Sequence, residues 1–151
     1  MKKLYILLLI GFTVSFLSCE VDDICLEPTT PQLIIRFYDA ANPTVKKSVT
    51  NLNVWINEKD SIIKNKATDS IAIPLKTDSD ITIYKFSSAN LVDEITYSYQ
   101  RNEVFVSRSC GYKTVFQNII ASKPTANWIK QMIIINPTIE NEKNAHIKIM
   151  H

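Results

Sequence analysis

From residue 32 onward, apolar and polar residues alternate along the chain with a period of two. Leu33, Ile35 and Phe37 share one face of the first such run, and Ile95 and Tyr97 do so in a later one. Alternation of this kind predicts strands that bury one face against a core. Because about eight or nine such runs follow one another at short spacing, we predict an all-β domain over residues 32–151, an antiparallel β-sandwich.

Several residues mark where the predicted strands end or bend. Pro74 cannot donate a hydrogen bond to a neighbouring strand, so the strand before it is expected at a sheet edge. The apolar phase shifts between Ile83 and Tyr84, which predicts a β-bulge. Residues 100–103, with the sequence QRNE, predict a tight hairpin, and Gly111 allows a further reversal.

The N-terminus has a different pattern. Lys2 and Lys3 precede an uncharged run, Leu4–Leu17, of 14 residues. A membrane-spanning helix needs about 20 apolar residues, whereas two lysines before a shorter apolar run are typical of a secretory signal. We therefore predict a signal peptide over residues 1–18 and a flexible acidic tether over residues 19–31.

The end of this signal, Leu17-Ser18-Cys19, resembles the lipobox of bacterial lipoproteins. The resemblance implies that Cys19 carries a thioether-linked diacylglycerol and becomes the first residue of the mature chain. Two or more acyl chains attach a protein stably to a membrane. The alternative is an ordinary cleaved signal with Cys19 as a free or disulfide-bonded cysteine.

Acidic residues follow Cys19 in the stretch EVDD. They resemble the export signal of surface lipoproteins in Bacteroidetes-type envelopes. We therefore expect the protein at the outer membrane, held there through its N-terminal lipid, on either the periplasmic face or the cell surface.

The cysteine count supports this interpretation. The chain contains three cysteines, Cys19, Cys25 and Cys110, and an odd number in an exported protein leaves one thiol to explain. Lipidation of Cys19 leaves a pair that an oxidising compartment would join. A metal-bound or reactive pair is the alternative, but neither cysteine has a nearby His or Cys in the sequence to complete a zinc site. We predict a disulfide between Cys25 and Cys110.

Charge and glycine content exclude two classes of partner. Loss of Lys2 and Lys3 with the signal leaves 15 basic residues against 15 acidic ones, so electrostatics do not favour nucleic acid. The chain has glycines only at Gly11 and Gly111, and phosphate-binding loops need several. We expect no cofactor.

Three aspartates, Asp69, Asp78 and Asp80, fall at predicted turns. Carboxylate oxygens there could hold calcium, but no 12-residue calcium-loop pattern is present, and aspartate is common in turns. We therefore expect no metal ion.

Four further side chains are candidate binding residues: Trp55, Trp128, Arg108 and His146. Trp55 lies on the polar face of its predicted strand and Trp128 opens another. Exposed tryptophan often binds a partner or stacks on a sugar, although packing against the core is the favoured role for both.

Arg108 is in phase with Val104 and Val106, so its side chain is expected to face the core and pair with Asp39 or Glu103; an anion site is the alternative. His146 is expected to face solvent or to form hydrogen bonds at a sheet edge rather than to act as a general base. His151, as the last residue, is expected to be mobile.

The pieces CEVDDIC, TTPQLIIRFYD, TDSIAIPL, EVFVSRSCGYKTVF and NPTIENEKNAHIKIM together resemble a family of small Bacteroidetes lipoproteins that is known only as a domain of unknown function. The resemblance covers roughly residues 19–150. It implies an envelope location and a mostly β fold, and it supplies no catalytic residues.

These observations favour a non-enzymatic lipoprotein that binds or supports an envelope protein or glycan. An open sheet edge is one surface that could contact such a partner. The alternative is an envelope hydrolase with an unrecognised site, which substitution of Arg108 or His146 would test. A small-ligand carrier is a third interpretation, and it requires an enclosed apolar cavity.

Overall fold

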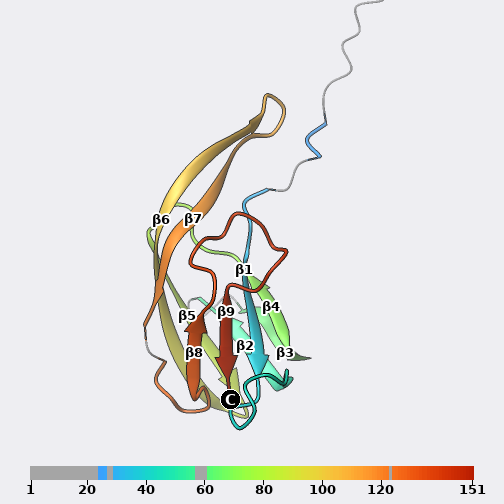
Figure 1. Ribbon diagram of the computed structural model, residues 1–151, viewed down its shortest axis with the longest axis vertical. Helices are drawn as coiled ribbons and strands as arrows, with labels where there is room; N and C mark the ends of the chain where they lie inside the picture. The colour runs from blue at the N-terminus through green and yellow to red at the C-terminus, as the bar shows by residue number, and fades with distance from the viewer. Residues whose placement is uncertain (1–23, 27–28, 57–60, 123) are drawn as a thin grey trace, which may run out of the picture.

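The computed structural model describes residues 24–26, 29–56, 61–122 and 124–151, which form two packed β-sheets and no helix (Figure 1). The predicted all-β sandwich is confirmed, with nine strands among the described residues. The first sheet has the order β4-β1-β9-β8. Its strands are β1 (Leu33–Tyr38), β4 (Ser70–Ile73), β8 (Gln131–Ile134) and β9 (Ile147–Met150).

The second sheet has the order β3-β2-β5-β6-β7. Its strands are β2 (Val49–Trp55), β3 (Ser61–Thr68), β5 (Ile81–Ser88), β6 (Leu91–Ser107) and β7 (Gly111–Ala121). All pairs in this sheet are antiparallel. In the first sheet, β1 and β9 pair in parallel, so the first and last strands of the domain lie side by side.

The core follows the period-two alternation. Leu33, Ile35 and Phe37 of β1 are fully buried, as are Ile95 and Tyr97 of β6. Side chains from both sheets meet in one cluster. Burial of an aliphatic or aromatic side chain contributes about 1.5–3 kcal/mol, so this cluster provides the main stabilisation of the sandwich.

The β5 strand differs from its prediction. Its pairing with β6 runs without a break from Ile81 to Ser88, so the predicted bulge is absent. Thr82 is buried instead, and its hydroxyl lies 2.6 Å from that of Tyr99. The apolar Ile81 and Ile83 therefore lie on the outer face, 49% and 42% exposed. One polar residue on the inner face produced the apparent phase shift.

The predicted hairpin at residues 100–103 is wrong, because β6 continues through it to Ser107. A bulge between Ser98 and Gln100 bends the β6–β7 pair there. Asn118, on the opposing strand, has a φ of 53°, and its amide donates to the Gln100 side chain at 2.7 Å. The reversal occurs before Gly111, whose φ of 69° suits glycine.

Beyond the bulge, residues 102–115 form a hairpin that projects past the sandwich, and we call it the arm (Figure 1). The segment that leads into β1 runs beside it (Figure 1). The backbone N–H of Thr114 in the arm donates to the Thr30 hydroxyl at 3.1 Å. The arm and this segment are therefore in contact below the arm's tip.

The strands observed at the sheet edges agree only in part with those predicted from the sequence. The β4 strand ends at Ile73, directly before Pro74, and lies at an edge as predicted. The β3 strand, at the edge of the other sheet, was not expected. Its residues are mostly exposed and polar, so it lacks the alternation that reveals a strand with one buried face.

Candidate functional site

A shallow depression lies on the outer face of the second sheet, around Trp55. It has a volume of about 470 Å³ and is lined by Asn53, Trp55, Ser61, Lys85 and Ser87. We call these residues the Trp55 surface. Apart from the indole, the lining side chains are an amide, two hydroxyls and an ammonium group.

The alternation of β2 explains why Trp55 faces outward. Leu52 and Val54 are fully buried, which directs Asn53 and Trp55 to the opposite face. In the neighbouring β5, Lys85 pairs with Trp55 and Ser87 pairs with Asn53. Three strands thus present one continuous surface, with the half-buried indole at its centre.

The Asn53 side chain is held in place by two hydrogen bonds. Its amide donates to the Asn51 carbonyl at 3.1 Å, and its carbonyl oxygen accepts the Asn65 N–H at 2.9 Å. Asn51 and Asn65 both adopt positive φ, which asparagine tolerates better than most residues. The polar part of the Trp55 surface is therefore fixed by the β2–β3 backbone.

Trp128 has the packing role that the sequence favoured. Its side chain is 8% exposed, and its indole N–H donates to the Phe86 carbonyl at 3.1 Å. The ring contacts those of Phe37 and His151. Trp128 therefore joins the two sheets and does not contribute to a binding surface.

His146 is buried, so the solvent-facing role expected for it is wrong, and its hydrogen bond lies between two interior strands rather than at a sheet edge. Its Nδ1 accepts the backbone N–H of Ile34 at 3.0 Å. Burial lowers the pKa of His146, although a hydrogen bond with the Asn141 backbone and the charge of Glu142 act in the opposite direction. The neutral ring fixes the start of β1 to the C-terminal segment.

His151 also differs from its prediction, because it is packed rather than mobile. Its backbone N–H donates to the Tyr38 carbonyl at 3.1 Å, and its ring lies edge-on to Phe37. Burial lowers its pKa as well. The chain end extends the pairing of β9 with β1.

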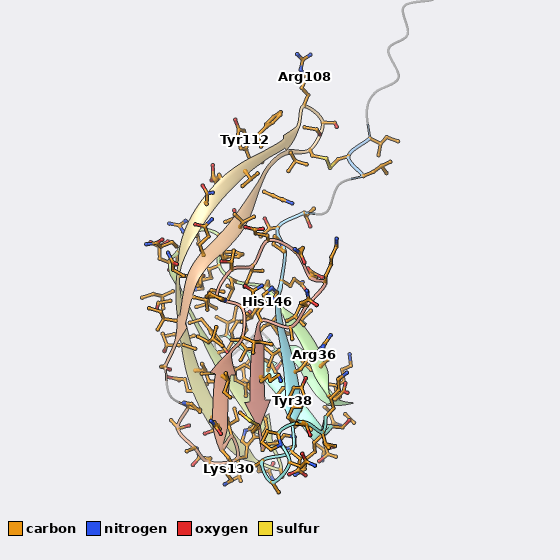
Figure 2. All side chains as sticks on the ribbon, viewed as in Figure 1. Arg36, Tyr38, Arg108, Tyr112, Lys130 and His146 are labelled. Atoms are coloured by element: carbon orange, nitrogen blue, oxygen red, sulfur yellow. A yellow bond between two sulfur atoms is a disulfide. The ribbon has the colours of Figure 1, made fainter. Side chains whose placement is uncertain are left out.

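Arg108 lies at the tip of the arm and points away from the molecule (Figure 2). The prediction that it faces the core is wrong, because the turn at residues 108–110 interrupts the alternation of β6. His146 lies far from it, in the body of the sandwich (Figure 2). The two residues considered for a hydrolase therefore do not form one site.

The predicted disulfide between Cys25 and Cys110 is confirmed, with a Cα–Cα distance of 4.9 Å. It joins the N-terminal segment to the tip of the arm and closes a loop of 85 residues. Below it, a groove of about 560 Å³ runs between this segment, Lys113 and residues 140–143. Cys19, the predicted lipidation site, lies outside the described residues, as do the signal peptide and the first part of the predicted tether.

Of the three turn aspartates, Asp78 and Asp80 both lie near Arg101, and Asp69 lies elsewhere. Asp80 accepts a hydrogen bond from Arg101 at 2.6 Å, and Asp69 lies 3.9 Å from the ammonium group of Lys46. Within the described part of the chain, no three His, Cys, Asp or Glu residues gather in a way that could hold a metal ion. Asp39, a predicted partner of Arg108, instead pairs with Lys47 at 3.5 Å.

Of the sequence candidates that lie among the described residues, the structure brings together only the two cysteines of the disulfide. Sequence reasoning identified Trp55 but missed its neighbours Lys85 and Ser87, because the pairing of β2 with β5 is not encoded locally. It also missed the exposed ring pair of Phe105 and Tyr112 on the arm, whose centroids lie 5.4 Å apart. The alternation over residues 103–106 offered a signal, but it gave no indication that this part of β6 leaves the sandwich.

Comparison with known proteins identifies a family but no activity. Among the described residues, no helix is long and apolar enough to cross a membrane. No curated protein and no solved structure matches the chain. The model of a family of unknown function, DUF6452, matches residues 51–151, from β2 to the C-terminus. The chain therefore belongs to the DUF6452 family.

Proposed function

We propose that this protein is a lipid-anchored, non-enzymatic protein of the outer membrane, and that it binds an envelope glycan through the Trp55 surface. The lipobox-like sequence at Cys19 and the acidic residues after it support the membrane location. The disulfide between Cys25 and Cys110 is consistent with an oxidising compartment.

The observation that carries the proposal is the half-buried indole of Trp55 among polar side chains on an open sheet face. An aromatic ring can stack on the apolar face of a sugar, while nearby polar groups bond to its hydroxyls. Ser61 and Ser87 supply hydroxyls that donate or accept, and Lys85 supplies N–H donors. This combination suits a neutral or acidic glycan.

A protein partner is less well matched to this surface. Protein-binding sites concentrate apolar and aromatic side chains at a desolvated centre. The polar groups around Trp55 would have to be desolvated by a protein, whereas sugar hydroxyls can satisfy them.

The proposal can be tested by co-sedimentation with insoluble glycan. Full-length mature protein with Cys19→Ser, which cannot be lipidated, is incubated with peptidoglycan sacculi or with insoluble envelope polysaccharide. Trp55→Ala should weaken retention at least about tenfold, which corresponds to about 1.4 kcal/mol.

Tyr112→Ala is the matched control, because it removes an aromatic residue that is 68% exposed on the arm. It should bind glycan like the unaltered protein. Equal retention of Trp55→Ala, or no retention of the unaltered protein on any of these glycans, would contradict the proposal. Capture of a protein that depends on Trp55 would favour a protein partner instead.

A further inference from the structure

We infer that the end of the molecule around the disulfide is a membrane-docking surface that rests on the lipid bilayer. We call this surface the apolar end and define it as Ile24, Leu26, Phe105 and Tyr112. The inference rests on the proposed attachment of lipid to Cys19, and it goes further by assigning which part of the folded domain meets the membrane.

The apolar end exposes an unusual amount of hydrophobic surface. Ile24 is 79% exposed, Leu26 90%, Phe105 55% and Tyr112 68%. Ile24 and Leu26 flank Cys25, and Tyr112 lines a small hollow together with the disulfide. Clustered exposed apolar residues usually mark a surface that contacts another molecule or a membrane.

The structure holds this surface in place. The disulfide fixes Cys25 to Cys110, and the Cys110 N–H donates to the Ser107 hydroxyl at 3.1 Å, which stabilises the turn. The rings of Phe105 and Tyr112 meet edge to face. The apolar side chains therefore lie on the arm or directly beside the disulfide at its tip.

The short stretch of chain between Cys19 and Cys25 indicates that the apolar end contacts lipid. Cys19 and Cys25 are six residues apart, and an extended chain spans at most about 3.3–3.6 Å per residue. A lipid on Cys19 therefore keeps the disulfide within about 20 Å of the bilayer surface. The apolar end is the part of the described domain that the anchor holds next to the membrane.

The residue types agree with an interfacial location. Tyrosine is enriched at the membrane–water interface, because its ring is apolar and its hydroxyl can remain hydrated. Arg108, at the tip of the arm (Figure 2), can bond to phosphate groups. The acidic residues after Cys19 disfavour anionic lipid, so we expect contact with zwitterionic headgroups through the apolar side chains.

The inference can be tested by tryptophan fluorescence on lipid vesicles. The lipidated protein carries Trp55→Phe to remove an emitting residue, together with Phe105→Trp as a reporter. On vesicles of brominated phosphatidylcholine, the reporter should lose emission and shift to shorter wavelength. The buried Trp128 provides a constant signal that also verifies folding.

Val45→Trp is the matched control. Val45 is 51% exposed and lies in the connection between β1 and β2, at the opposite end of the sandwich from the arm (Figure 1). Its emission should be unaffected by brominated lipid. If Phe105→Trp is quenched no more than Val45→Trp, the inference is overturned.

A different way of attaching the protein to vesicles tests the docking surface independently of lipid on Cys19. Protein with Cys19→Ser and a hexahistidine tag before residue 19 is held on vesicles that contain nickel-chelating lipid. Quenching of Phe105→Trp in this form supports the membrane-docking surface even if Cys19 proves to be unmodified in cells. A lipidated Cys19 without quenching in either form would reject the docking surface and leave the proposed anchor intact.

Discussion

Asp93 should be among the residues whose replacement destabilises this fold most. Its carboxylate is fully buried on β6. One oxygen accepts the Thr125 hydroxyl at 2.7 Å and the Asn127 N–H at 2.8 Å. The other accepts the N–H groups of Trp128 and Ile129, both at 2.8 Å. Asp93 therefore satisfies the backbone of the connection between β7 and β8.

The magnitude follows from these contacts. Asp93→Ala leaves the N–H groups of Trp128 and Ile129 buried without an acceptor, and each such group costs about 1–3 kcal/mol. Two further hydrogen bonds, to Thr125 and Asn127, are also lost. We therefore expect the free energy of unfolding to fall by about 3–5 kcal/mol. Because small domains are stable by about 5–15 kcal/mol, this is a large fraction of the total. Asp93→Asn, which retains one acceptor oxygen, should lose less.

The pKa of Asp93 gives the same prediction a pH dependence. Burial alone would raise this pKa, but the hydrogen bonds from Ile129, Thr125, Asn127 and Trp128 outweigh it, and the pKa is lowered. The stabilisation is therefore complete above the ordinary value of 3.8 and is lost as pH falls through the lower folded value.

Urea unfolding of the Cys19→Ser protein, followed by tryptophan fluorescence, measures the effect. Glu94→Ala is the control, because it removes an exposed acid next to Asp93 on the same strand. If Asp93→Ala unfolds within about 0.5 kcal/mol of Glu94→Ala, a difference typical of surface substitutions, the proposed role of Asp93 is wrong.

Three further predictions concern stability. Cys110→Ser opens the 85-residue loop and should cost up to about 4–5 kcal/mol in urea unfolding; an unchanged midpoint would contradict this. Because burial lowers the pKa of His146 from 6.5, stability should be complete above pH 6.5 and fall below it. The dependence of stability on pH should be weaker in His146→Gln. An unchanged dependence would show that His146 is not its source. The Tyr97 hydroxyl is buried without a partner among the described residues, so Tyr97→Phe should raise thermal stability by about 1 kcal/mol, and a loss would show that it is paired.

The sequence predicted the fold class and the core because both depend on local alternation. Leu33, Ile35 and Phe37 are buried as their spacing requires. The pairing of strands is non-local, so the parallel contact between β1 and β9 was not accessible from pattern alone. The buried Thr82 shows a second limit, since its hydroxyl is satisfied by Tyr99 from a different strand.

The candidate sites also divide into those that the sequence alone predicts and those that depend on the course or pairing of strands. The disulfide could be predicted, because the expected lipid on Cys19 leaves Cys25 and Cys110 as the remaining pair. The side chain of Arg108 could not be placed, because alternation holds only while the strand continues, and the turn begins at that residue. The setting of Trp55 required knowledge of which strands flank β2.

The central claim is that lipid on Cys19 holds this domain at a membrane. Mass spectrometry of the native protein, purified from membranes, tests it most directly. We predict a mature chain that begins at Cys19 and carries diacylglycerol on that sulfur, with Cys25 and Cys110 joined. A chain with a free thiol at Cys19, or one that begins at another residue, would contradict the account.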